Sequence, residues 1–216
     1  MVRLHESKND AWFNLLISMW TFEHKAQKAG YSCIAGVDEA GRGPLAGPVV
    51  SAAVVLPHDF NAKGVNDSKK LTPKQRDALY TVIMENALAV SVGSASHGEI
   101  DQINILRASL LSMKRAVNGL LLIPDHLLID GKFTIDSSIS QQAIVKGDSL
   151  SISIAAASII AKVTRDRIMA EMHLFYPGYG FDRHKGYPTK AHRLALAELG
   201  PCPVHRYSFK GVGIKP

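Results

Sequence analysis

Short apolar runs alternate along the chain with longer segments whose apolar positions recur at helical spacing. Residues 32–37, 49–56 and 89–95 are short, apolar and rich in β-branched side chains, so they are predicted to form buried strands. The predicted helices span residues 73–86, 96–119, 149–173 and 189–199. Strands and helices are therefore expected to follow one another throughout the chain.

Local signals define the ends of several of these helices. Thr72 is followed by Pro73 and by Gln75, which forms a capping box with proline at the first helical position. Ser96 and Glu99 form a second capping box, and that helix is predicted to end at Gly119. Because its apolar positions lie on one stripe, they are expected to pack in the core.

The remaining segments give weaker signals. Residues 120–123 and 127–129 flank a turn, and residues 133–135 and 143–145 are predicted as further short strands. Residues 176–190 combine prolines, glycines and tyrosines with basic residues, which is typical of a structured loop that carries function. The basic tail, residues 204–216, is expected to lie over the surface.

The first residues carry one amphipathic stretch. Apolar side chains at helical spacing within residues 11–20 predict a helix packed on the domain, and a membrane or partner helix is the alternative. Asn14 and Ser18 interrupt the stretch, and it is too short to span a bilayer. No membrane association is expected, and residues 1–20 are predicted to be a variable helical extension of a domain at residues 21–216.

Composition narrows the class of protein. The chain has 216 residues and 46% apolar content, which suits one domain with one core. Its 25 basic residues exceed its 19 acidic ones, giving a formal net charge of +6 that favours a polyanionic partner such as nucleic acid. Cys33 and Cys202 lie far apart and form no metal-binding or disulfide pattern, so a reducing, cytoplasmic location is expected.

Four acidic residues follow predicted strands. They are Asp38, Glu39, Asp130 and Asp148. Side chains at the ends of neighbouring strands can converge, and a cluster of acids repels itself unless cations are bound. Carboxylates with no histidine or cysteine cluster select Mg²⁺ or Mn²⁺ over zinc. Two such ions about 3.5–4 Å apart can activate water and stabilise the leaving oxygen in phosphodiester cleavage.

The loop after the first strand has a composition suited to a phosphate backbone. Gly41 and Gly43 lack a Cβ, so a substrate could approach the main chain closely, and Arg42 offers a planar fork for a phosphate. Asp38 and Glu39 are adjacent and would point to opposite faces of a regular strand. We therefore expect a distortion of the backbone if both are to serve one site.

Structural alternatives remain for the other acids. Asp130 precedes Gly131 and could belong to an ordinary turn, and Asp148 could be the N-cap of the long helix. Asp166 is a rival for the fourth position, although Lys162 lies one turn before it and could form a helix-surface ion pair with it.

Several motifs together resemble bacterial ribonuclease HII. They are D-E-A-G-R-G-P-L-A-G-P at residues 38–48, L-L-I-D-G at 127–131, A-A-A-S-I-I-A-K-V-T-R-D at 155–166 and H-K-G-Y-P-T at 184–189. The resemblance covers roughly residues 21–212, in the order and spacing of the family.

The resemblance implies a fold, an activity and a ligand set. The fold class would be α/β, a ribonuclease H-like mixed sheet flanked by helices, with a small C-terminal region of helices and loops that binds substrate. Two divalent ions, Mg²⁺ or Mn²⁺, would be held by Asp38, Glu39, Asp130 and Asp148. The enzyme would cut the RNA strand of RNA–DNA hybrids and incise on the 5′ side of a ribonucleotide in duplex DNA, leaving 3′-hydroxyl and 5′-phosphate ends.

The resemblance also implies substrate contacts. Main-chain groups of Gly41, Arg42 and Gly43 would contact the ribose, since the 2′-hydroxyl is the local mark of RNA. Tyr187 would pack on the sugar at the RNA-to-DNA junction, although without the motif it would be interpreted as a half-buried loop aromatic. Lys69 would face the nucleic-acid backbone or, as the alternative, be a solvated lysine. Lys162 and Arg165 lie in the family's helix motif and are further candidates for substrate binding.

Two other functions were considered. Gly41, Gly43 and Ala46 match a dinucleotide-binding pattern, but a β-branched run follows where that motif requires a helix. The second alternative is a non-catalytic nucleic-acid binder, although acids lining a groove would weaken its affinity for phosphate. We expect a monomer, and the sequence leaves open any contact with a replication clamp.

Overall fold

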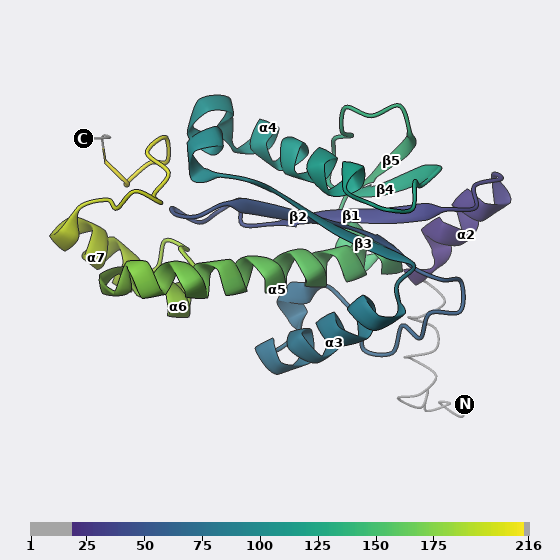
Figure 1. Cartoon of the computed structure of the whole chain (residues 1–216), viewed down its shortest axis with the longest axis horizontal. Coiled ribbons are helices and arrows are strands. Elements are labelled where there is room, and N and C mark those ends of the chain that lie inside the picture. Colours follow the sequence, from purple (N-terminus) through teal and green to yellow (C-terminus); the bar gives the residue numbers. More distant parts are fainter. Residues whose placement is uncertain (1–18, 214–216) are drawn as a thin grey trace, which may run out of the picture.

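The computed structural model describes residues 19–213 of the chain. A five-stranded mixed sheet lies between layers of helices (Figure 1), with strand order β3-β2-β1-β4-β5. β1 pairs antiparallel with β2 and parallel with β4, while β2 and β3 are antiparallel and β4 and β5 parallel. The strands are β1 (Ile34–Ala40), β2 (Val49–Val55), β3 (Ala89–Ala95), β4 (His126–Asp130) and β5 (Ser140–Ile144).

Helices cover both faces of the sheet. In Figure 1, α4 lies on one face and α5 on the other with α3 beyond it, while α2 and α7 lie at opposite ends of the molecule. The α-helices are α2 (Thr21–Lys28), α3 (Pro73–Asn86), α4 (His97–Asn118), α5 (Ile152–Phe175), α6 (Phe181–His184) and α7 (Lys190–Leu199). Three short 3₁₀ helices are η1 (Ser68–Lys70), η2 (Gly147–Ser149) and η3 (Pro177–Tyr179).

Alternation along β1 sends successive side chains to the two helical layers. Ala35 and Val37 belong to the core cluster that includes residues of α4. Gly36 faces α5, where a Cβ would lie only 2.0 Å from the carbonyl carbon of Ser153. Glycine at this position therefore lets the start of α5 pack directly against the central strand.

Several predicted boundaries are confirmed. α3 begins at Pro73 behind the Thr72 capping box, and α4 begins behind the Ser96 capping box. β3 spans the predicted residues 89–95. For the two helices the signal is local, so no tertiary contact was needed to recognise it.

The apolar run at residues 120–123, before the predicted turn, forms no strand: the segment is irregular, and Leu121 and Ile123 are exposed. The strand predicted at residues 133–135 is also absent, and β5 begins at Ser140, before the predicted residue 143. β5 was misplaced because its residues are largely polar: the side chain of Gln141 bonds the main chain of Ile135 and Ser137.

The C-terminal segment is more ordered than expected. The predicted loop at residues 176–190 contains η3 and α6, and α7 is close to the prediction. Between residues 204 and 213 the tail does not merely lie over the surface, because His205 and Arg206 are fully buried.

The amphipathic helix predicted at residues 11–20 lies almost wholly outside the described residues. α2 was not predicted from the sequence, and its Glu23 is buried against the start of α5. None of the described helices combines the length and apolar content needed to cross a bilayer.

Candidate active site

Parallel pairing of β1 and β4 brings two of the predicted acids together. Val37 is the register partner of Ile129, so the next residues of the two strands, Asp38 and Asp130, lie at the same edge of the sheet. Glu39 follows on β1. The convergence that the sequence suggested therefore results from the register of two central strands.

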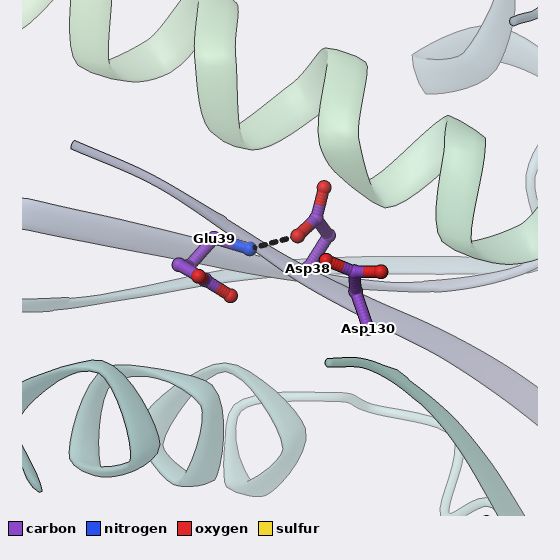
Figure 2. Close-up of side chains that lie close together, drawn as sticks. All are labelled: Asp38, Glu39 and Asp130. Atoms are coloured by element: carbon purple, nitrogen blue, oxygen red, sulfur yellow. Dashed lines mark hydrogen bonds between the residues drawn. The ribbon is translucent and has the colours of Figure 1, made fainter. Parts of the chain in front are cut away.

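One carboxylate oxygen from each of Asp38, Glu39 and Asp130 lies within 4.8 Å of the other two. Figure 2 shows Asp38 directed toward the helix above the sheet and Glu39 directed the other way, with Asp130 beside Asp38. The expected distortion of β1 is absent, because pairing with β2 continues through Asp38, Glu39 and Ala40. A regular strand suffices because the glutamate is long enough to bring its carboxylate to the edge where the aspartates meet.

The cluster is electrostatically strained without a cation. Burial raises the pKa of Asp38 well above its usual value, and the charges of Glu39 and Asp130 raise it further, while hydrogen bonds from Ser158 and the Glu39 amide oppose the shift. Burial also raises the pKa of Glu39 against the opposing charge of Arg42. For Asp130, burial and the neighbouring Asp148 raise the pKa. One buried and two partly buried acids, all with raised pKa values, form a site suited to a positively charged ligand.

Asp148 lies next to this cluster without belonging to it. It sits in η2, where the amide of neighbouring Gly147 donates a 2.6 Å hydrogen bond to Asp130. The N-cap of α5 is Ser151, so capping does not explain Asp148. Its carboxylate instead accepts a 3.1 Å hydrogen bond from the Lys69 ammonium.

Lys69 reaches Asp148 from η1, on the loop before α3. Partial burial opposes its charge, but the hydrogen bond and charge of Asp148 raise the pKa of Lys69 to about 12. Lys69 is therefore a cation beside the acids, and its side chain is 74% exposed to solvent.

The glycine loop lies directly beyond the acids. Gly41 adopts a φ of +102°, and the guanidinium of Arg42 bonds Glu39 at 3.3 Å. A Cβ on Gly43 would lie 3.7 Å from the Tyr187 ring, so the loop and this tyrosine face each other. Tyr187 is 39% exposed, which leaves its ring accessible to a ligand.

Two candidates on α5 differ in their surroundings. Lys162 pairs with Asp166 at 2.8 Å, as the sequence suggested, and its ammonium lies 5.7 Å from the centre of the Tyr187 ring. The direct substrate contact expected for Arg165 is not possible in this conformation, because its side chain is fully buried. It donates hydrogen bonds to the carbonyls of Pro48, Lys185 and Ala46.

Two residues of this region were not assigned to the site from the sequence. Ser158 lies in an apolar segment, yet it bonds both Asp38 and Ser68. Arg206 lies in the tail, and its guanidinium donates five hydrogen bonds to carbonyls of the glycine loop. The available signal was indirect: a buried loop must satisfy its carbonyls, and an unassigned arginine is a natural donor.

Comparison with known proteins identifies the family. A family model described as ribonuclease HII matches residues 35–212. The chain belongs to the ribonuclease HII family. It is 59% identical to the ribonuclease HII of Geobacter sulfurreducens over 195 residues, which cover 90% of each chain. It is 55% identical to that of Syntrophus aciditrophicus over 201 residues, covering 93% of this chain and 95% of the relative.

Solved structures agree with this assignment. Ribonuclease H2 from Pyrococcus horikoshii matches with a TM-score of 0.70 at 28% identity, covering 84% of this chain and 95% of that one. Ribonuclease HII from Archaeoglobus fulgidus, solved in complex with PCNA, matches with a TM-score of 0.68 at 26% identity, covering 85% and 94%. The predicted α/β, ribonuclease H-like fold is confirmed, and the protein is a metal-dependent hydrolase of the ribonuclease H type.

Proposed function

We propose that this ribonuclease HII family member hydrolyses the RNA strand of RNA–DNA hybrids and incises duplex DNA on the 5′ side of an embedded ribonucleotide. The products would carry 3′-hydroxyl and 5′-phosphate ends. The observation that carries this proposal is the position of the Asp38, Glu39 and Asp130 cluster directly beside the Gly41–Gly43 loop and Tyr187. Cleavage chemistry and recognition of a sugar would then share one surface.

The acidic cluster fits divalent cations. Its ligand atoms are hard carboxylate oxygens within 4.8 Å of one another, and burial makes their charges unfavourable without a counter-ion. Asp38, Glu39 and Asp130 would hold Mg²⁺ or Mn²⁺, and Asp148 would complete the site for a second ion. Bound ions would supply activation of water and stabilisation of the departing 3′ oxygen, without a covalent enzyme intermediate.

Residues around the acids would position the substrate. Lys69 neutralises part of the charge of Asp148 and presents a cation toward the backbone of the nucleic acid. The Arg42 side chain is half exposed beyond its contact with Glu39, so it is available to a phosphate.

The groups that would read the sugar lie on the glycine loop and on Tyr187, which face each other. Amides of Arg42 and Gly43 have no acceptor among the described residues, so they are available to hydrogen-bond a 2′-hydroxyl. The Tyr187 ring, with Lys162 beside it, offers a face for the sugar. A deoxyribose would leave the loop amides without an acceptor, which is the physical basis of selectivity for a ribonucleotide.

Replacement of Asp130 by Asn tests the proposed chemistry. The amide keeps the shape of the side chain but removes a charged ligand, so turnover of a duplex with one ribonucleotide should fall by at least about 10²-fold, whereas binding should be retained. Asp136→Asn is the matched control, because Asp136 is exposed and its ion pair among residues 19–213 is with Lys114. Cleavage by Asp130→Asn at the parent rate under saturating Mg²⁺ would refute the role of Asp130.

A further inference from the structure

Two fully buried arginines lie beneath the glycine loop, residues 41–48, which is proposed to contact the ribose. Arg165 comes from α5 and Arg206 from the tail after α7. Neither forms an ion pair with a carboxylate within the described part of the chain. Burial without a counter-ion is costly, and it lowers the pKa of Arg165 to about 10 and that of Arg206 to about 9. Main-chain carbonyls provide the compensation.

Arg206 binds the main chain of the glycine loop from the interior of the protein. Its guanidinium donates to the carbonyls of Gly41 at 2.7 Å, Arg42 at 3.2 Å and Pro44 at 2.8 Å. It also reaches Gly47 at 2.9 Å and Pro48 at 3.1 Å. Because the carbonyls on both sides of Gly43 are held inward, the orientation of the peptide planes at the tip of the loop depends on this one side chain.

Arg165 joins the loop to the segment that carries Tyr187. It donates to Pro48 at 3.0 Å and Ala46 at 3.2 Å on one side, and to Lys185 at 3.0 Å on the other. A main-chain hydrogen bond from Leu45 to Gly186 reinforces the link. The Arg165 guanidinium also lies 5.9 Å from the centre of the Tyr187 ring. The spacing between Gly43 and Tyr187 is therefore fixed by buried contacts, independently of any ligand.

We propose that Arg206 and Arg165 are positioning residues that set the slot between the Gly41–Gly43 loop and Tyr187, and thereby set discrimination between ribose and deoxyribose. The inference rests on the proposed function. Arg206 orients the peptide groups of the loop, and Arg165 sets the distance between the loop and the Tyr187 ring. Lysine cannot replace either residue, because a single ammonium cannot span carbonyls that a planar guanidinium with five donors reaches.

The test is the ratio of affinities for two duplexes of identical sequence, one with a single ribonucleotide and one entirely of DNA. Binding is measured by fluorescence anisotropy with Mg²⁺ on the full-length Asp130→Asn protein, whose slow turnover leaves the duplex intact during the measurement. Adding Arg206→Lys should lower the ribonucleotide preference by about tenfold, the equivalent of about one lost hydrogen bond, with less than about a twofold change in affinity for DNA. An unchanged ratio would overturn the role of Arg206.

A purely structural effect is separated by a control. Ile83→Ala removes a fully buried side chain of α3 and should lower the melting temperature without altering the preference. If Ile83→Ala lowers the preference as much as Arg206→Lys does, loss of stability explains the result and the inference fails. If the parent itself has no preference for the ribonucleotide, the proposed function fails instead.

Arg165 provides a second test that does not depend on the folding of an Arg206 variant. Arg165→Lys should lower the ribonucleotide preference in the presence of Tyr187 and change it by less than about twofold in a Tyr187→Ala background. Independent effects of the two substitutions, multiplying in the double variant, would exclude action of Arg165 through the tyrosine.

Discussion

At the scale of single residues, the acidic cluster suits the binding of a cation and lowers the stability of the protein without one. Asp38 is buried among like charges, and its pKa is raised well above the usual value by burial and then by Glu39 and Asp130. Its carboxylate nevertheless accepts hydrogen bonds from the Glu39 amide and from Ser158. Such a residue is costly in the free protein and is explained by a ligand that carries positive charge.

Asp38→Asn should therefore stabilise the protein while removing activity. The amide oxygen can still accept the hydrogen bond from the Glu39 amide, and the buried charge is gone. In chelator, the melting temperature should rise by a few degrees, equivalent to about 1 kcal/mol, and cleavage should be lost. A melting temperature equal to or below that of the parent would show that Asp38 is not strained in the way described.

At Gly41, both the backbone conformation and the surrounding side chains require glycine. Its φ of +102° disfavours any side chain, and a Cβ would lie 2.0 Å from the Arg165 Nε atom. Gly41→Ala should destabilise the protein by about 2 kcal/mol more than Gly30→Ala in a urea titration. Gly30 is the matched control, because its φ is +97° but nothing lies within 4 Å of its Cβ position. Equal losses would mean that the contact with Arg165 is unimportant.

At the scale of elements, α5 connects the site to the rest of the fold. Its start packs on β1 through Gly36, its middle carries Ser158 next to Asp38, and its later turns carry Lys162 and Arg165. The N-terminus of this helix is held by Glu23 of α2, which accepts hydrogen bonds from the Ser151 hydroxyl at 2.6 Å and the Ser153 amide at 3.0 Å.

Glu23→Ala should destabilise the protein by about 2 kcal/mol, because two buried donors at the start of α5 lose their acceptor. Glu23→Gln should change stability by less than about 0.5 kcal/mol: burial raises the pKa of Glu23, and a neutral amide oxygen still accepts both bonds. Urea titrations of the two variants check this. A harmless Glu23→Ala substitution would show that α2 does not stabilise the start of α5.

At the scale of the whole molecule, local signals predicted more of the fold than of the site. Capping boxes at Thr72 and Ser96 located two helices because their hydrogen bonds lie within a few residues. The polar β5 was misplaced and a strand was wrongly predicted at residues 133–135, because strand formation depends on a neighbour in the sheet. Asp38 and Asp130 could be predicted from strand ends, whereas Arg206 acts across more than 150 positions and gave no local signal.

The C-terminal region makes the stability of the whole protein depend on pH. His205 is buried beside His192, with 3.1 Å between their Nε2 atoms, and burial chiefly lowers its pKa to about 4 from an ordinary value of 6.5. Because the unfolded chain binds the proton more tightly, the stability from neutral His205 is present above about pH 6.5 and is lost as pH falls toward about 4.

Comparison with His205→Gln isolates this effect. Between about pH 7.5 and about pH 5, the free energy of unfolding of the parent should fall more than that of the variant, by on the order of 1 kcal/mol after allowance for solvent screening. Urea titrations at the two pH values measure the difference. Parallel losses in the two proteins would assign the pH dependence to other groups.

The most direct measurement is cleavage of labelled duplex DNA that carries one ribonucleotide, with Mg²⁺, with Mn²⁺ and with chelator, and with the cut position mapped on a gel. The account predicts incision on the 5′ side of the ribonucleotide that depends on metal and is absent from the all-DNA duplex. Retained binding of the duplex with no incision under either metal would contradict it.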